Sequence, residues 1–503
     1  MKKGITAVVL VLLLSGLVAA KTMIIGFDDD LATLDPADFS HRQTEAMLRQ
    51  VYEGLSTYTP DREIVSELAL SITAVEPTIY EIILRPDVTF HDGSPLTAED
   101  VAFSINRLVQ DGAMAGRTSQ RRGLLGPTKG ALAVDECTVH VELTSPWPLF
   151  PRFIPWQMIV PKAVGDGYID RPVGTGPFRF EEWVRDSHFS VVKNEDYWGD
   201  PPKLDRVVFR VIGDESARVA ALRSGEIDIA TFIPVHEISS LEGHPDINVV
   251  TVLGTRSYFL EMNVNKPPFN DIRVRQAMNH AVDMDTIIGV LYEDRATRIP
   301  FILSPQAFAY HGELKMFDYD PEKARWLLAE AGYPNGFSFE LDVVDNHRAR
   351  AEIYQAMLAE VGIDVKIRTW PTSGAVRDAY MQGKDKRVEE QRDAFLNDWG
   401  NASLDPFDIL IPKFHSDHRG LGRGNYSGFA DPEVDRLLEA TLTADSDEER
   451  LTAFRRAQEI IHAQVPMVFE FVPHEIYGVG SRVKNWRPSP DSRIHLKEVD
   501  LME

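Results

Sequence analysis

Short apolar runs rich in β-branched and aromatic residues alternate along the chain with longer segments whose apolar residues recur every three or four positions. The short runs are bounded by turn-forming residues, which is typical of β-strands. They predict strands at residues 23–27, 79–84, 207–212, 227–231, 363–368 and 467–472.

The longer segments predict helices, two of which have well-marked starts. Asp320 can cap the first turn of one helix, and Pro321 suits its first helical position. A second helix is predicted over residues 98–109, because Thr97 followed by Asp100 forms an acidic variant of the capping box. Two later helices are predicted at residues 432–442 and 447–464.

This alternation of strands and helices predicts a mixed α/β fold, and no short-period repeat indicates a solenoid. The chain has 503 residues, 44% of them hydrophobic, which exceeds the usual size of a single core. We therefore expect two or three packed lobes.

The first twenty residues are typical of an export signal. Lys2 and Lys3 precede an apolar run of about fourteen residues, and small residues at 18–20 offer a cleavage site. The run is shorter than the roughly twenty residues that span a bilayer. No cysteine follows it to carry a lipid, so the mature protein is predicted to be soluble and periplasmic.

Charge and cysteine content exclude several classes of partner and site. Acidic residues number 77 against 53 basic ones, for a formal net charge of −24, which disfavours nucleic acids and anionic membranes as partners. Cys137 is the single cysteine, so neither an internal disulfide nor a multi-thiolate metal site can form.

No catalytic motif is complete. His236-Glu237 and His474-Glu475 begin the zinc-protease pattern but lack its second histidine. No G-x-S-x-G elbow occurs, and His415 and His418 have no clear third metal ligand. We therefore expect neither an enzyme, nor a cofactor, nor a bound metal.

Separated stretches of the chain resemble family 5 of the bacterial extracellular solute-binding proteins, which includes dipeptide- and oligopeptide-binding proteins of ABC importers. The stretches are ILRPDVTFHDGSPLTAEDVAF at 83–103, VGTGPF at 173–178, NEDYWG at 194–199, AALRSGEID at 220–228, DYDPEKA at 318–324 and LAEAG at 328–332. Their order and spacing span nearly the whole chain after the signal.

The resemblance implies a bilobed periplasmic-binding-protein fold with a two-strand hinge and an extra subdomain inserted in the N-terminal lobe. It implies that a ligand closes the lobes and that the closed form delivers it to the membrane permease. The implied limits are a signal peptide at 1–20, lobe I at 21–46, 174–258 and 477–503, the insert at 47–173, and lobe II at 259–476. Crossing strands are expected near 258–263 and 471–477.

The resemblance also implies candidate ligand contacts. In peptide-binding members an aspartate meets the α-ammonium group, and the corresponding segment 394–406 offers Asp398, with Trp399 as a wall for a side-chain pocket. Extra residues before Asp405-Pro406 depart from the family pattern. Asp398 therefore has a second interpretation, as a loop aspartate that caps a turn.

Three further residues are candidates in the cleft. Arg348 or Arg350 would bind a peptide carboxylate, although either could be a solvated arginine at a helix start. Tyr258, near a crossing strand, would contact the ligand or simply pack.

Several ligands remain compatible with this fold. We expect a monomeric receptor for a di- or oligopeptide, and the alternatives are a nickel complex, haem, an opine, glutathione or an oligosaccharide. A sugar receptor would use aromatic residues such as Trp156, Trp183 and Trp399 rather than Asp398. A secreted hydrolase or chaperone is the alternative from another functional class.

Overall fold

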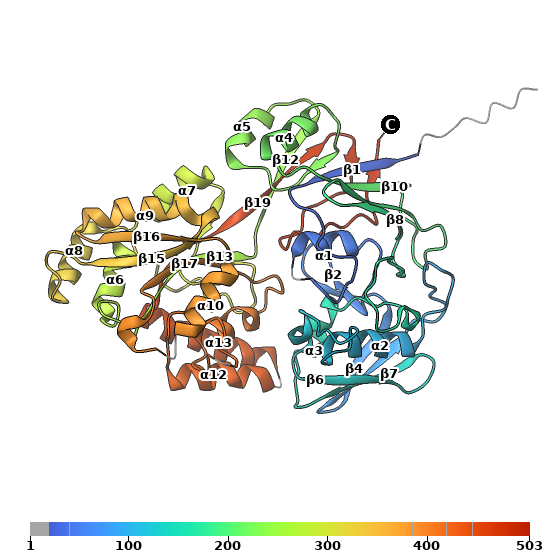
Figure 1. Cartoon of the computed structure of the whole chain (residues 1–503), viewed down its shortest axis with the longest axis horizontal. Helices are drawn as coiled ribbons and strands as arrows, with labels where there is room; N and C mark the ends of the chain where they lie inside the picture. The colour runs from blue at the N-terminus through green and yellow to red at the C-terminus, as the bar shows by residue number, and fades with distance from the viewer. Residues whose placement is uncertain (1–19, 40, 384–385, 419, 445, 503) are drawn as a thin grey trace, which may run out of the picture.

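The structure is a computed structural model that describes residues 20–39, 41–383, 386–418, 420–444 and 446–502. Residues 1–19 of the predicted export signal lie outside the described residues. The chain forms two lobes side by side, each built on its own mixed sheet with helices (Figure 1). Within the described part of the chain, no helix combines the length and apolarity needed to cross a membrane.

The first lobe contains an eight-stranded sheet whose strands come from distant parts of the chain. Its central strand β1 lies parallel to β10 and β11, while β19 lies antiparallel to β11 and β12. The strands are β1 (Thr22–Phe27), β8 (Phe178–Val184), β9 (His188–Lys193), β10 (Arg206–Val211), β11 (Ile229–Ala230), β12 (Ile247–Leu253) and β19 (Phe471–Gly480), and β14 (Ala296–Arg298) of the second lobe pairs with the start of β19. The helices of this lobe are α1 (Arg42–Leu48), α4 (Glu215–Arg223) and α5 (Ile238–Leu241).

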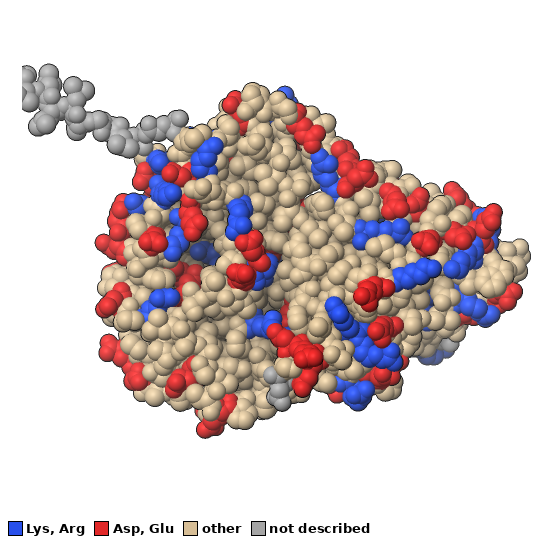
Figure 2. Space-filling view, turned by 180° about the vertical axis from the view of Figure 1, so that it is seen from behind, with Lys and Arg blue, Asp and Glu red and all other residues tan. Residues whose placement is uncertain are grey.

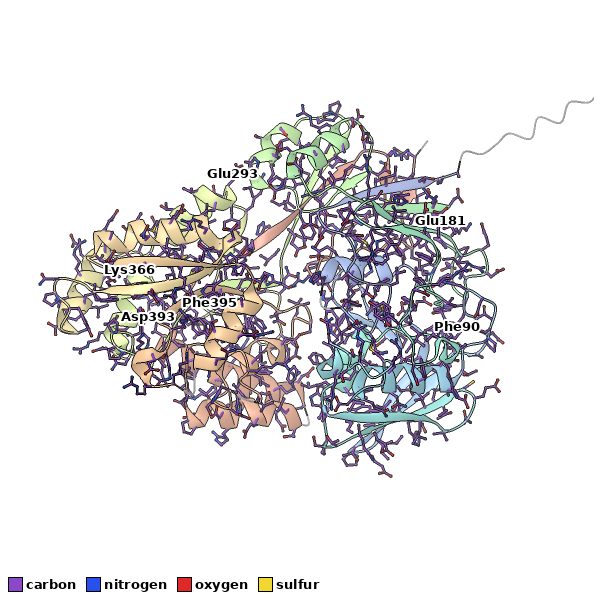
Figure 3. All side chains as sticks on the ribbon, viewed as in Figure 1. Phe90, Glu181, Glu293, Lys366, Asp393 and Phe395 are labelled. Atoms are coloured by element: carbon purple, nitrogen blue, oxygen red, sulfur yellow. The ribbon has the colours of Figure 1, made fainter. Side chains whose placement is uncertain are left out.

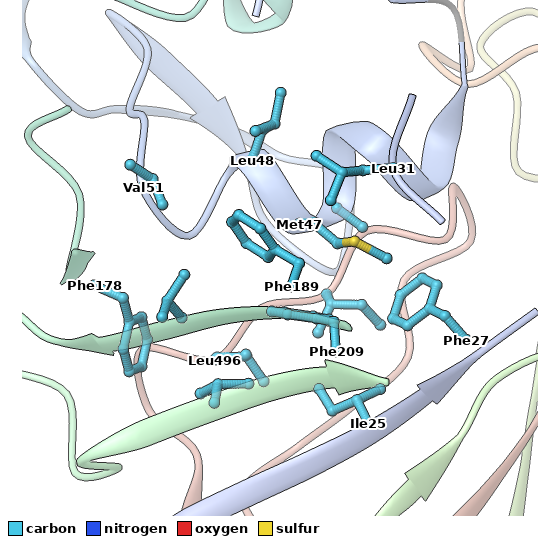
Figure 4. Close-up of a cluster of buried hydrophobic side chains, with 14 of the residues drawn as sticks. Ile25, Phe27, Leu31, Met47, Leu48, Val51, Phe178, Phe189, Phe209 and Leu496 are labelled. Carbon is cyan, nitrogen blue, oxygen red and sulfur yellow. The ribbon is translucent and has the colours of Figure 1, made fainter. Parts of the chain in front are cut away.

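The core of this lobe packs α1 and the C-terminal segment against the sheet (Figure 4). Phe27 and Phe209 meet edge to face, with their ring centroids 5.7 Å apart, and Met47 of α1 is fully buried in the same cluster. The apolar alternation of the strands therefore places one face of the sheet in this core.

A subdomain extends from the first lobe as a four-stranded antiparallel sheet covered by one helix. The strands are β4 (Ala69–Glu76), β5 (Ile79–Leu84), β6 (Thr128–Ala133) and β7 (Thr138–Leu143), and the helix is α2 (Ala98–Val109). A small hairpin of β2 (Ser56–Tyr58) and β3 (Ile64–Ser66), with the short helix α3 (Phe150–Phe153), completes it.

The second lobe is built on a five-stranded sheet in the order β16-β15-β17-β13-β18. These strands are β13 (Arg256–Met262), β15 (Ser338–Val344), β16 (Asp364–Trp370), β17 (Ala394–Gly400) and β18 (Met467–Phe469). Its helices are α6 (Ile272–His280), α7 (Met284–Tyr292), α8 (Pro321–Glu330), α9 (Arg348–Glu360), α10 (Ser373–Gly383), α11 (Leu410–Phe414), α12 (Pro432–Thr443) and α13 (Asp447–Gln464).

Figure 3 places Lys366 and Phe395 in this second lobe, with Phe90 and Glu181 in the other half of the molecule. Phe395 of β17 is buried against Tyr380, with the ring centroids 5.6 Å apart. Helix α10 is thereby held on the sheet.

Two short connections carry the chain between the lobes. Strand β12 of the first sheet leads into β13 of the second through Gly254 and Thr255, and β18 of the second sheet leads into β19 of the first through Glu470. The first connection lies three residues before the crossing segment expected at 258–263, and the second lies immediately before the one expected at 471–477.

The predicted elements are largely confirmed. Strand β5 and helices α2 and α13 have the predicted bounds, and α8 begins at Pro321 with Asp320 accepting a hydrogen bond from the Lys323 amide at 2.8 Å. The strand predicted at 467–472 is wrong as a single element. It is split at Glu470, whose buried carboxylate forms an ion pair with Arg350 at 2.8 Å where the chain changes lobes.

Candidate ligand-binding cleft

A cavity of about 750 Å³ lies between the lobes, directly beside the two connections. Ligand pockets for small molecules typically have this size. The first lobe supplies Asp29, His41, Arg42, Gln43, Glu215, Phe232, Ile233, Pro234, Val235 and His236. The second lobe supplies Arg256, Tyr258, Leu291 and Tyr292, and the connection at Gly254 and the start of β19 supply Gly254, Pro473, His474 and Glu475.

An aromatic cluster forms the second-lobe side of this cavity. Tyr258 stacks on Phe471 with the ring centroids 5.3 Å apart, and Tyr292 contacts Phe471 edge-on at 4.9 Å. Burial raises the pKa of Tyr258 well above its usual value, with Asp398 adding to the effect. Tyr258, one of the candidate ligand contacts, therefore presents a neutral, half-buried ring to the cavity.

Two arginines stand at the hinge end of the cavity. Arg42, at the start of α1, donates to the Thr255 hydroxyl at 3.0 Å and lies 3.4 Å from the Glu475 carboxylate. Arg256, at the start of β13, forms an ion pair with Asp398. Guanidinium groups from both lobes thus reach the cavity.

Asp398 lies in β17 directly opposite Tyr258 of β13, because the two strands pair in antiparallel register. One carboxylate oxygen accepts from Arg256, and the other is 2.6 Å from Nε2 of His347. Burial disfavours the charged carboxylate, but Arg256 and His347 outweigh this effect, so the pKa of Asp398 lies far below its usual value. Asp398 is therefore an anion whose two oxygens already have protein partners.

The structure places Trp399 away from this cavity. Its ring nitrogen donates to the Asp408 carbonyl at 2.7 Å, and the Lys413 ammonium lies 4.5 Å from the centre of its ring. Lys413 is fully buried and forms an ion pair with Glu261 at 2.7 Å. In this arrangement Trp399 packs against the interior of the second lobe.

The two candidate arginines of α9 have different environments. Arg348 is exposed and pairs with Glu352 at 3.0 Å on the same helix. Arg350 is 2% exposed, and its guanidinium binds Glu470 and lies 4.6 Å from the centre of the Tyr258 ring. Arg350 therefore supports the aromatic wall from behind, while Arg348 lies on the surface.

The fold brings Tyr258, Arg350 and Asp398 together and leaves Trp399 and Arg348 apart from them. Sequence reasoning missed Arg42, Arg256 and Glu475, which line the cavity. Only position along the chain could have indicated two of them: Arg256 lies two residues before Tyr258, and Glu475 lies in the predicted crossing segment at 471–477.

A second cavity, of about 440 Å³, lies within the first lobe between the β2–β3 hairpin and residues 485–498. Burial raises the pKa of Glu53, on its wall, to about 8, although Trp198 and Tyr197 donate to this carboxyl group. Among the described residues, no group of three or more His, Cys, Asp or Glu side chains is placed to hold a metal ion.

Comparison with known proteins gives a consistent result. Residues 63–420 match the family described as "Bacterial extracellular solute-binding proteins, family 5 Middle". The chain is 29% identical to the glutathione-binding protein GsiB of Pectobacterium atrosepticum, over 96% of this chain and 95% of that protein.

Solved structures with the same fold cover almost all of the chain. The periplasmic binding protein DppA from Helicobacter pylori, in complex with the peptide STSA, is 28% identical, with a TM-score of 0.80 over 96% of this chain and 98% of that one. HbpA2 from Haemophilus parasuis is 25% identical, with a TM-score of 0.85 over 96% of this chain and all of its own.

Proposed function

The chain belongs to family 5 of the bacterial extracellular solute-binding proteins, and from this premise we propose that it captures a di- or oligopeptide, or a peptide-like solute such as glutathione. It does so as the monomeric periplasmic component of an ABC importer. The family consists of solute-binding proteins rather than enzymes. The closed, loaded form is the one that the membrane permease recognises.

The cavity between the lobes is the observation that carries this proposal. Its wall combines cationic groups with carboxylates and an aromatic surface, as a zwitterionic peptide requires. As approximate limits we propose those implied by the family resemblance, 21–46, 174–258 and 477–503 for lobe I, 47–173 for the insert and 259–476 for lobe II, with the crossings shifted to residues 254–255 and 470, so that Arg256 and Tyr258 belong to lobe II. A ligand that contacts both lobes stabilises only the arrangement in which they are close.

Native mass spectrometry of gently purified protein, followed by identification of any released molecule, tests the proposal directly. We expect peptides or glutathione, and we expect isothermal titration calorimetry to detect binding of the tetrapeptide Ser-Thr-Ser-Ala or of glutathione. Release of an oligosaccharide or a nickel complex instead, with no peptide binding, would contradict a peptide ligand while leaving the family assignment intact.

We keep Asp398 as the proposed partner of the ligand ammonium group, with Tyr258 beside it. Its pairing with Arg256 and His347 means that the ammonium would have to share an oxygen that already accepts a hydrogen bond. In the same calorimetry, the wild type should bind N-acetylated Ser-Thr-Ser-Ala more weakly than the free peptide, and Asp398→Asn should lose this preference. A preference that survives Asp398→Asn counts against the contact.

A further inference from the structure

Arg42 and Arg256 converge on one point at the hinge end of the cavity, although they belong to different lobes. A Cβ atom placed on Gly400 would lie 2.9 Å from Nη2 of Arg42 and 3.3 Å from Nη2 of Arg256. Gly400 pairs with Arg256 across the β13–β17 ladder, so the backbone fixes this approach from the second-lobe side. The fold thus holds two positive charges beside each other, which costs free energy unless an anion lies near both.

The protein neutralises these two charges incompletely. Glu475 is 3.4 Å from Arg42, whereas charge-assisted N–H···O bonds are usually about 2.7–2.9 Å long. Glu475 also accepts hydrogen bonds from Ser492 and Tyr477, and burial raises its pKa, which weakens it as an anion. Arg256 shares its ion-pair partner Asp398 with His347, and Glu475 acts on Arg256 only at longer range.

Both guanidinium groups remain accessible from the cavity. The Arg256 side chain is 43% exposed and the Arg42 side chain is 23% exposed, and both line the cavity wall. A guanidinium has five N–H donors, and the hydrogen bonds described above occupy only some of them. Burial, and after it the neighbouring Arg256, lowers the pKa of Arg42, although Glu475 and Asp491 oppose this effect.

We infer that Arg42 and Arg256 together bind a carboxylate group of the solute, one arginine from each lobe. This inference rests on the proposed function and identifies the chemical group that the hinge end of the cleft recognises. A carboxylate fits because its two oxygens can accept paired N–H bonds from planar guanidinium groups. Asp29, Glu215 and Glu475 on the same wall disfavour a ligand with several negative charges.

The location of the pair links recognition to closure. Because one arginine belongs to each lobe, a carboxylate bound to both holds the lobes together and offsets the repulsion between the two positive charges. A bound carboxylate therefore stabilises the closed arrangement specifically, which is the differential contact that a population shift requires.

Matched ligands test the inference by calorimetry. Ser-Thr-Ser-Ala and its C-terminal amide are titrated into the wild type, Arg42→Gln and Arg256→Gln, with Arg122→Gln as a control for an exposed arginine outside the cleft. We expect each cleft variant to bind the free acid at least about ten-fold more weakly, the scale of one lost hydrogen bond to a charged group. The amide should bind weakly to all four proteins.

Arg42→Lys and Arg256→Lys serve as controls for a folding defect, since they keep the positive charge but lose the paired N–H donors of the guanidinium group. Thermal unfolding confirms that each variant is folded. If both glutamine variants bind acid and amide as the wild type does, the arginine pair does not recognise a carboxylate, even though the peptide function stands.

A second measurement tests the arginine pair separately from the peptide function if neither Ser-Thr-Ser-Ala nor its amide binds. Thermal unfolding is followed in sodium acetate and in sodium chloride at equal ionic strength. We expect acetate to raise the Tm of the wild type more than chloride does, and Arg42→Gln and Arg256→Gln to lose this difference. Equal effects of acetate on wild type and variants would overturn the inference, whereas failure of peptide binding alone would overturn only the peptide ligand.

Discussion

His91 has both ring nitrogens occupied when it is neutral. Its Nδ1 accepts a hydrogen bond from the Gly174 amide at 3.3 Å, and its Nε2 donates to the Gly176 carbonyl at 2.9 Å. A protonated ring would carry a hydrogen on Nδ1, which would then face the N–H donor of the Gly174 backbone with no acceptor between them. Burial lowers the pKa of His91 to about 4, so the folded protein holds it uncharged near neutral pH.

We predict that His91 makes part of the protein's stability depend on pH. The unfolded chain protonates a histidine near pH 6.5, whereas the folded chain resists protonation down to about pH 4, so the contribution is present above about 6.5 and is lost as the pH falls towards 4. Urea unfolding of His91→Gln should show a shallower decline over this interval than the wild type. His236→Gln, at an exposed position, is the control, and an equal decline in wild type and His91→Gln would contradict the prediction.

At the scale of elements, two segments typical of the family meet at the end of α1. The His91 amide donates to the Gly174 carbonyl at 2.8 Å, and the Gly176 amide donates to the Val51 carbonyl at 2.9 Å. A Cβ on Gly174 would lie 2.0 Å from that Val51 oxygen, closer than any side-chain atom can approach. The glycine is therefore required by close backbone contact between segments that lie far apart in the sequence.

Gly174→Ala should lower the free energy of unfolding by at least about 1–3 kcal/mol, because backbone atoms must move to admit the methyl group. Gly167→Ala is the matched control, since no atom lies within 4 Å of its added Cβ. Urea denaturation of both variants measures the difference. Similar unfolding midpoints for the two alanine variants would show that the backbone around Gly174 can move to admit a methyl group at little cost in stability.

At the scale of the whole molecule, the lobes touch at the end of the cleft that lies away from the hinge. Phe407 of the second lobe packs against Phe153 and Trp147 of the subdomain, with ring centroids 5.1 and 6.0 Å apart. Arg152 beside them forms a two-bond ion pair with Asp447 at the start of α13. The lobes thus have contacts in this structure that do not depend on a ligand.

We predict that the double variant Arg152→Gln/Phe407→Ala shifts the unliganded protein towards an open arrangement. An aromatic contact contributes about 0.5–1.5 kcal/mol and an exposed ion pair up to about 1 kcal/mol, so their loss changes the closed-to-open ratio several-fold. Small-angle X-ray scattering should show a larger radius of gyration. Arg487→Gln, which breaks an exposed ion pair within the first lobe, is the control.

The same double variant should also weaken ligand binding, because a smaller fraction of the protein is then ready to close. An unchanged radius of gyration in the double variant would show that these contacts do not hold the lobes together. The acidic chain itself does not prevent the lobes from meeting. Lys and Arg alternate with Asp and Glu over the face in Figure 2.

The sequence by itself determined those elements whose ends depend on interactions between residues only a few positions apart. The Thr97 amide donates to the Asp100 carboxylate at 2.8 Å, and Asp320 caps α8, as predicted, because both bonds close inside one helical turn. The family motifs likewise determined the bilobed fold. The break at Glu470 was not predictable, because it depends on Arg350, 120 positions away.

The tertiary structure alone decided which charged side chains line the cavity between the lobes. The family resemblance made Asp398 and Arg350 candidate ligand contacts, but only the strand register and the lobe connections bring them close to their partners, Arg256 and Glu470. Arg42 reaches the cavity from a helix more than 200 positions away from Arg256. Local sequence patterns indicate hydrogen bonds between residues that are close along the chain, whereas the distance between two charges far apart in the sequence depends on how whole lobes pack.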